Sequence, residues 1–174
     1  LDIIGAALNG VEKGKADTLL DEIAAQGSEG GWVVIASALR ERLPGDLPGA
    51  LEASRKYIIQ ADIWYGCDCF GERVPGPALV SYFDAALDHL KSWRTDANAW
   101  VRRSLGVAGH FWTKRTRDPQ YNAQARKLLE FLSPMLEERD INTAKGVGWA
   151  LKTMGRFYPE IAAQWLEEEL IRKG

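Results

Sequence analysis

The chain has 174 residues, and its 22 Lys and Arg residues nearly balance 24 Asp and Glu residues, which leaves a formal net charge of −2. Hydrophobic residues make up 46% and charged residues 26%, values typical of a soluble globular protein long enough to bury a core. No apolar run approaches the roughly 18 residues that a membrane-spanning helix needs. A dedicated nucleic-acid-binding protein is usually basic, so any such function must depend on a local cluster of positive charge.

The cysteines and histidines argue against a disulfide and against a metal site. Cys67 and Cys69 are separated by one residue, which is too close for a useful disulfide loop and favours a reducing, cytoplasmic setting. His89 and His110 lie in separate segments, whereas structural zinc usually takes four closely spaced Cys and His ligands. We therefore expect no metal and no other cofactor.

Short breaks rich in Gly, Pro, Asp and Asn divide the chain into segments of about 12 to 18 residues, the usual length of helices in globular proteins. These breaks lie at residues 27–31, 44–49, 75–77, 95–98, 117–119 and 158–159.

Apolar residues within the segments recur at helical spacing. The run Trp32–Ala36 continues into charged residues up to Arg42, which favours a helix over a strand. The stretches Pro77–Trp93 and Asn122–Leu136 each place their apolar residues on one face. Because no convincing strand pattern occurs, the sequence predicts an all-α fold.

Two of the predicted helices resemble each other. Residues 101–108 align without gaps on residues 143–150, which matches Gly106 with Gly148, and an acid-Asn turn precedes each segment. A period of about 40 to 47 residues with two helices per unit is typical of HEAT and armadillo repeats. We expect HEAT-like or ARM-like antiparallel helical repeats in a curved right-handed solenoid; the alternative is a generic helical bundle with one chance similarity.

The same alignment matches two cations. Arg103 falls on Lys145, and the second helix of each pair lines the concave face of a solenoid. Two cations in register on a concave wall suit a phosphate backbone.

Three sequence blocks point to a family. They are Asp-x-Trp-x-x-x-Asp at residues 62–68, Trp-x-x-Arg at residues 100–103 and Lys-x-x-Gly-Trp-x-Leu-Lys at residues 145–152. Their order and spacing resemble the DNA alkylation repair family, whose AlkD-type members are glycosylases that remove positively charged alkylated purines. The resemblance covers about residues 58–170, and the N-terminal helices look shorter than is usual there. We accordingly expect one domain over residues 1–174, shortened at its N-terminus.

The resemblance implies a role for four residues. Trp64 and Trp149 match the aromatic residues of the site, Asp68 matches the catalytic carboxylate, and Arg103 matches the arginine that contacts the DNA backbone. The implied partner is duplex DNA that contains alkylated purines, bound by a monomer without base flipping. The alternative is a non-catalytic HEAT-repeat protein that binds DNA or another protein.

The chemistry of these residue types agrees with that function. A purine alkylated at N3 or N7 is a cation, and an indole face attracts a cation by roughly 0.5 to 2 kcal/mol. A carboxylate stabilises the oxocarbenium character that the sugar acquires as the glycosidic bond breaks. Trp64 and Asp68 are four residues apart, so they share one helix face.

Each residue also has a simpler interpretation. Trp64 and Trp149 could be core residues, and Asp68 could form a salt bridge with Arg103 or Arg73. Asp62 is expected to cap the helix that contains Trp64.

Further basic residues extend the expected DNA contacts. We predict that Lys145, Lys114 and Arg115 bind the DNA backbone, with Lys152 and Arg156 continuing the track. The run from Lys114 could instead be a solvated helix end whose cations complement the helix dipole. We expect Arg102 to face solvent and Glu138 to lie on the convex back.

Overall fold

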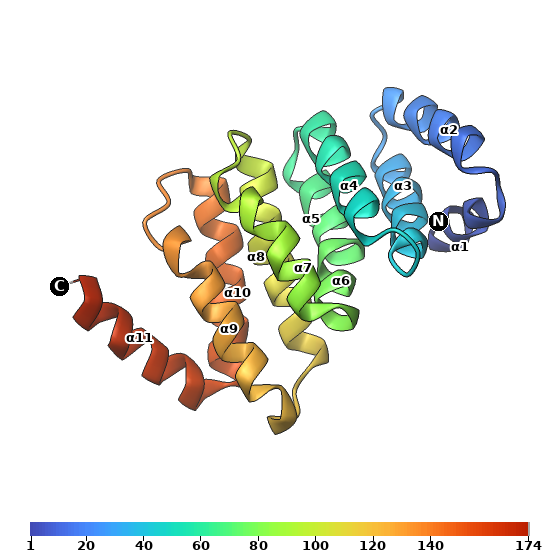
Figure 1. Ribbon diagram of the computed structural model, residues 1–174. Coiled ribbons are helices and arrows are strands. Elements are labelled where there is room, and N and C mark those ends of the chain that lie inside the picture. The colour runs from blue at the N-terminus through green and yellow to red at the C-terminus, as the bar shows by residue number, and fades with distance from the viewer. Residues whose placement is uncertain (174) are drawn as a thin grey trace.

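The computed structural model describes residues 1–173, and within that range every regular element is a helix (Figure 1). The α-helices are α1 (Asp2–Ala7), α2 (Lys13–Ala25), α3 (Glu29–Arg42), α4 (Leu47–Ala61), α5 (Trp64–Arg73), α6 (Pro75–Ser81), α7 (Phe83–Leu90), α8 (Ala99–Arg115), α9 (Asn122–Leu132), α10 (Ile141–Phe157) and α11 (Pro159–Lys173). Short 3-10 turns join several of them: η1 (Leu8–Gly10), η2 (Lys91–Thr95), η3 (Pro119–Tyr121) and η4 (Ser133–Met135). The prediction of an all-α fold is confirmed.

The helices form two rows. Helices α3, α5 with α6, α8 and α10 pack side by side in that order and make an inner row, while α2, α4, α7 and α9 lie along it as an outer row (Figure 1). Helix α11 packs on α9 and α10. The core lies between the rows and includes the fully buried Leu39, Phe70, Leu105 and Leu128.

Three of the predicted breaks, and the predicted turn at Asp140, contain helix caps, whereas residues 75–77 belong to α6. Ser28, Asp46, Asn98 and Asp140 each accept hydrogen bonds from backbone N–H groups at the start of the following helix. These side chains satisfy donors that a helix leaves unpaired at its N-terminus. Gly27 has a φ of 61°, the left-handed conformation that favours glycine at the end of α2.

The stretch Pro77–Trp93 is not one amphipathic segment. The chain breaks at Tyr82 (φ −139°, ψ 46°), between α6 and α7. Helix α6 packs on α8 in the inner row, whereas α7 belongs to the outer row. The bend is the point at which the chain changes rows, so both pieces bury their apolar residues.

Asp62 does not cap the helix of Trp64. Ile63 holds the cap position of α5, and Asp62 instead ends α4 in a left-handed conformation (φ 46°). Its Oδ1 accepts a 2.9 Å hydrogen bond from Nε1 of Trp100, so it joins the α4–α5 corner to the start of α8.

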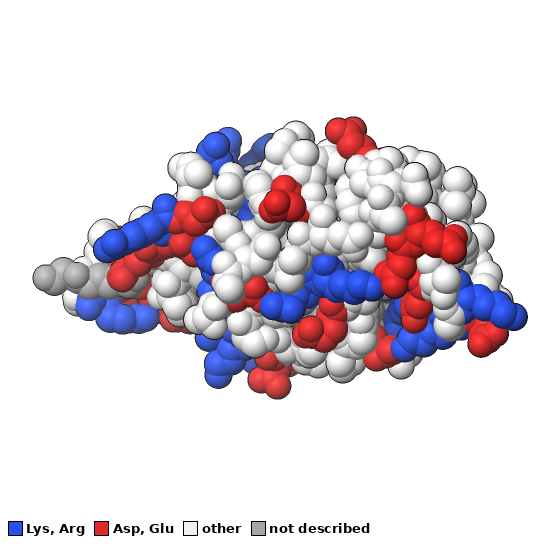
Figure 2. Space-filling view, turned by 90° about the horizontal axis from the view of Figure 1, so that it is seen from above, with Lys and Arg blue, Asp and Glu red and all other residues white. Residues whose placement is uncertain are grey.

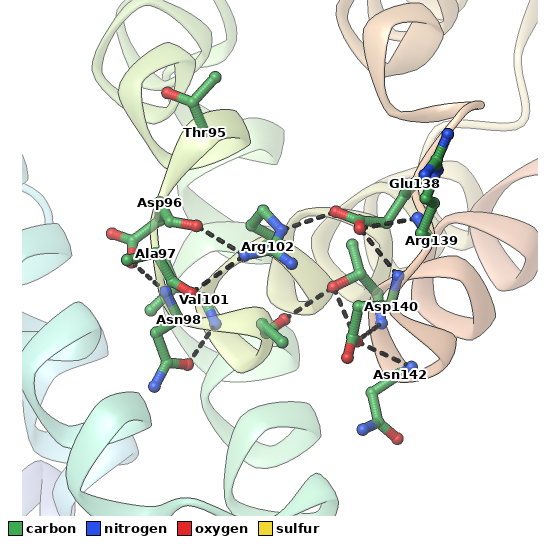
Figure 3. Close-up of polar contacts among 12 residues, drawn as sticks. Thr95, Asp96, Ala97, Asn98, Val101, Arg102, Glu138, Arg139, Asp140 and Asn142 are labelled. Atoms are coloured by element: carbon green, nitrogen blue, oxygen red, sulfur yellow. Dashed lines mark hydrogen bonds and ion pairs between the residues drawn. The ribbon is translucent and has the colours of Figure 1, made fainter.

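Arg102 does not face solvent, because its side chain pairs with Glu138. The Arg102 guanidinium donates to Oε2 of Glu138 at 2.6 Å and to the carbonyl oxygens of Asp96 and Ala97 (Figure 3). Only 16% of the Arg102 side chain and 17% of the Glu138 side chain are exposed. The pair lies at the N-terminal ends of α8 and α10. The hydrogen bond from Arg102 lowers the pKa of Glu138.

Candidate nucleic-acid interface and carboxylate site

Asp68 and Arg103 form a bidentate ion pair between α5 and α8. Nε and Nη2 of Arg103 each donate a 2.8 Å hydrogen bond to one carboxylate oxygen of Asp68. The side chains are 17% and 11% exposed, so the pair is shielded but can still be reached from solvent. Arg103 and not Arg73 is therefore the partner of Asp68; Arg73 pairs with Asp2. The Asp68 carboxylate raises the pKa of Arg103 above its usual value.

Arg103 also joins the pair to α10. Its Nη1 donates to the backbone carbonyl of Asn142 at 3.1 Å. The two helices can approach so closely because glycines meet at their crossing. A Cβ on Gly106 would lie 2.2 Å from the backbone of Gly146, and one on Gly146 would lie 2.6 Å from the Arg103 carbonyl oxygen. No larger residue fits either position without a shift of the helices.

Trp149 lies two helical turns after Asn142 on α10 and stacks on His110 of α8. The ring centroids are 4.0 Å apart and the planes are inclined by 25°. Trp149 is half-buried, while His110 is only 7% exposed. Nδ1 of His110 is 2.7 Å from the hydroxyl oxygen of Thr153, which lies one turn after Trp149 on α10.

The His110–Trp149 stack lies close enough to the Asp68–Arg103 ion pair for the Asp68 charge to act on His110. Burial lowers the pKa of His110 to about 4, and the charges of Lys114 and Arg115 act in the same direction. The Asp68 carboxylate is close enough to act in the opposite direction. His110 is thus a neutral imidazole near pH 7.

Trp64 begins α5, one turn before Asp68, and its side chain is 57% exposed. Its ring makes an edge-on contact with Tyr65, at 5.9 Å between centroids. The interpretation of Trp64 as a core residue is therefore wrong. A large exposed indole beside a carboxylate is free to contact a ligand.

A basic cavity of about 380 Å³ lies between the C-terminal ends of α8 and α10. Trp149, His110 and Phe157 supply its rings, and its cations are Lys114, Arg117, Lys152 and Arg156.

The cations of this region form no ion pairs with acids among the residues that the structure describes. Lys114, Arg115, Lys145, Lys152 and Arg156 are all exposed, and none of them forms an ion pair with an acid in the described part of the chain. Three arginines of this region lie over aromatic rings instead. Arg115 lies over the ring of Phe111 at 3.5 Å, and Arg117 and Arg156 lie over Phe157.

The other end of the same helices has a different surface. Figure 2 shows the upper side of the molecule in Figure 1, where α8 and α10 begin, and acidic and basic side chains lie beside each other there. The basic cavity is at the opposite ends of these helices.

The structure brings Asp68 and Arg103 into contact and places Trp149 against two residues that the sequence did not single out. His110 and Thr153 were not expected at the site. The signal for His110 was its position seven residues after Arg103, which places it two turns further along the same helix face. Lys145, aligned with Arg103, is exposed, whereas Arg103 is buried in its ion pair.

Within residues 1–173, no helix is long and apolar enough to cross a membrane, and no group of three or more His, Cys, Asp or Glu side chains is placed to hold a metal ion. Cys67 and Cys69 are both buried free thiols, and burial raises the pKa of Cys69 to about 11.

The molecule is thus an all-helical protein with a shielded carboxylate beside an aromatic and basic surface. Residues 15–173 match the profile of the family described as DNA alkylation repair enzyme, and the chain belongs to this family. No curated protein and no solved structure gives a significant match.

Proposed function

We propose that the protein is a DNA glycosylase that hydrolyses the N-glycosidic bond of cationic N3- or N7-alkylated purines in duplex DNA. The observation that carries this proposal is the Asp68 carboxylate, held in a fixed orientation by Arg103 and partly exposed near His110, the residue that stacks on Trp149.

The reaction needs a carboxylate and little else. As the bond between C1′ and N9 breaks, its electron pair neutralises the cationic purine, and positive charge develops on the sugar. Asp68 stabilises that charge, and water attacks C1′ and loses a proton to the carboxylate or to solvent. The products are a free alkylpurine and an abasic site. No lysine nucleophile takes part, so strand cleavage is not expected.

Trp64 and Trp149 are proposed to contact the lesion nucleotide. Both present indole surface to solvent, and an indole face favours a cation over a neutral base. The cavity next to Trp149 is unsuitable for the base itself, because its Lys and Arg side chains repel a cation. This favours a lesion that stays in the duplex and a cavity that receives a phosphate.

The basic residues then serve the DNA backbone. We propose phosphate contacts by Lys114, Arg115 and Lys145, which are exposed and form no ion pair with an acid within the described residues. Arg103 uses three of its five N–H groups on Asp68 and Asn142, so two remain for a phosphate. Arginine suits this double role because its donors form a planar fork.

We further infer that the two rows of helices are HEAT-like repeats of a right-handed solenoid whose inner row faces the DNA. The caps Asn98 and Asp140 occupy equivalent places in α8 and α10, as a repeat requires.

The second candidate is a non-catalytic DNA- or protein-binding protein of the same fold. The observation in its favour is the full pairing of Asp68 with Arg103, which would serve packing alone.

Release of 7-methylguanine from methylated duplex DNA separates the two candidates. We expect release by the wild-type protein and at least about a hundredfold slower release by Asp68→Asn, because a group that stabilises transition-state charge is worth that much. The matched control is Asp84→Asn on α7, where the acid is 76% exposed and pairs with Lys127. This control should retain full activity.

Asp68→Asn also leaves Arg103 without its counter-ion, which could lower stability. The double variant Asp68→Asn/Arg103→Gln removes both charges and should refold normally while remaining inactive. Activity in this folded double variant, or no release by the folded wild-type protein, would overturn the proposed reaction.

A further inference from the structure

Trp149, His110 and Thr153 form a closed set of contacts. The imidazole of His110 stacks on the indole of Trp149 at 4.0 Å, and its Nδ1 lies 2.7 Å from Oγ1 of Thr153. The Thr153 hydroxyl donates in turn to the backbone carbonyl of Trp149 at 2.9 Å. The chemistry proposed above uses neither His110 nor Thr153.

The hydrogen bonds fix the orientation of the imidazole. A threonine hydroxyl has one proton, and here it goes to the Trp149 carbonyl. Nδ1 of His110 must therefore be the donor to Oγ1 of Thr153. One hydrogen bond and one stacked ring hold His110 in place, and the imidazole covers one face of the indole.

We propose that His110 is a positioning residue: it fixes the plane of Trp149 so that the uncovered indole face meets the cationic nucleobase. The proposal rests on the proposed function for its ligand, but the contact between His110 and Trp149 can be tested without it. Without the imidazole, a half-buried indole on α10 would lose its stacking partner and turn about its side-chain bonds.

The charge of the imidazole matters as much as its shape. A protonated ring 4.0 Å behind the indole would compete with the cationic base for the same π electrons. The groups around His110 keep it neutral near pH 7, because burial and the charges of Lys114 and Arg115 lower its pKa to about 4. Lys152 and Arg156 line the same cavity, and the Asp68 carboxylate acts in the opposite direction on the pKa of His110.

Fluorine NMR of protein labelled with 5-fluorotryptophan tests the positioning directly. The seven Trp residues give seven lines, and Trp149→Phe identifies the line of Trp149. We expect His110→Ala to shift or broaden that line and to leave the other six in place, whereas His110→Phe, which keeps a flat ring, should restore a single narrow line. Thr153→Val should move the Trp149 line less than His110→Ala. His89→Ala, at the other histidine, is the control and should change nothing at Trp149.

Single-turnover release of 7-methylguanine tests the consequence. His110→Ala should slow release by roughly three- to thirtyfold, the range that one cation–π contact covers. His110→Phe should recover most of the rate, and binding of undamaged duplex should not change in either variant. A purely structural role of His110 would lower stability and move several fluorine lines together.

An unchanged Trp149 line in His110→Ala overturns the proposal, whether or not the release of 7-methylguanine becomes slower. If His110→Ala does not fold, His110→Phe and Thr153→Val decide: the proposal requires that Thr153→Val move the Trp149 line alone, and it fails if that line stays in place. If the wild-type protein releases no base, the proposed function fails, while the fluorine spectra still establish whether His110 fixes Trp149.

Discussion

The two ends of the α8–α10 helix pair differ in whether their charged side chains form ion pairs. At the N-terminal ends Arg102 pairs with Glu138, and Oδ1 of the cap residue Asp140 accepts hydrogen bonds from backbone N–H groups of α10 (Figure 3). Arg103, the next residue of α8, pairs with Asp68. At the C-terminal ends the Lys and Arg side chains around the basic cavity have no acid to pair with in residues 1–173. Paired charges hold the helices together, whereas unpaired charges on the same helices remain available for an anion.

The largest expected effect is on stability, from a substitution where α8 crosses α10 between the two ends. Gly106→Val places a side chain 2.2 Å from the backbone of Gly146, and we expect a loss of about 3 kcal/mol in the free energy of unfolding, since overpacking against rigid backbone costs this much. Urea denaturation measures it. Gly148→Ala is the control: nothing lies within 4 Å of the added Cβ, so stability should stay the same or rise by up to about 1 kcal/mol. Equal stability of the two variants would show that the helices do not need this contact.

The paired end should lose stability when one charge is removed. Arg102→Met removes the guanidinium that donates to Oε2 of Glu138 and to the carbonyls of Asp96 and Ala97, and we expect a loss of about 2 kcal/mol in the free energy of unfolding. Lys127→Met is the control, since its ion pair with Asp84 is exposed and should be worth less than about 1 kcal/mol.

The same pair predicts a pH dependence. Arg102 lowers the pKa of Glu138 from 4.5, so the pair stabilises the fold above that pH and the contribution disappears as pH falls through the folded pKa. The stability difference between wild type and Arg102→Met should therefore shrink below about pH 4. A constant difference from pH 7 to pH 3 would mean that packing of the Arg102 side chain, and not its charge, stabilises this end.

Substitution of cations at the unpaired end should change DNA binding and leave the free energy of unfolding nearly unchanged. Lys114→Gln/Lys152→Gln removes two cations of the cavity, and the slope of log affinity against log salt for undamaged duplex should fall by about 1 to 2. The free energy of unfolding should change by less than about 0.5 kcal/mol, because no acid loses a partner. Lys56→Gln/Lys127→Gln in the outer row removes two lysines that do pair with acids and should leave the slope unchanged. Equal slopes for both double variants would place the DNA elsewhere.

This contrast explains what the sequence could and could not predict. Helix starts followed from local chemistry: the side chains of Asn98 and Asp140 bond their own backbone, whatever the tertiary structure. The ion-pair partner of Asp68 remained open between two arginines, because choosing Arg103 requires the packing of α5 on α8.

Residues whose role depends on a neighbouring helix were misjudged. Arg102 looked like a surface residue, and only the return of the chain to Glu138 buries it. His110 looked like a lone histidine, because its partners Trp149 and Thr153 lie about forty residues away on α10. The repeat alignment matched Gly106 with Gly148, yet Gly106 contacts Gly146. Two equivalent helices that pack side by side contact each other through different faces. Residues at equivalent positions in the two repeats therefore need not be in contact.

The smallest expected effect is the titration of His110, which links the two ends. Its pKa is lowered from 6.5 to about 4, so between these values the unfolded chain binds a proton that the folded protein does not. Stability therefore rises with pH in this window and falls as pH drops through it. Wild type should lose about 1 kcal/mol more than His110→Phe between pH 7 and about pH 5.7, measured by urea denaturation at each pH. Because Lys114 contributes to the low pKa, Lys114→Gln should reduce that difference; if it leaves the difference unchanged, burial alone keeps the imidazole neutral and the unpaired cations have no part in it.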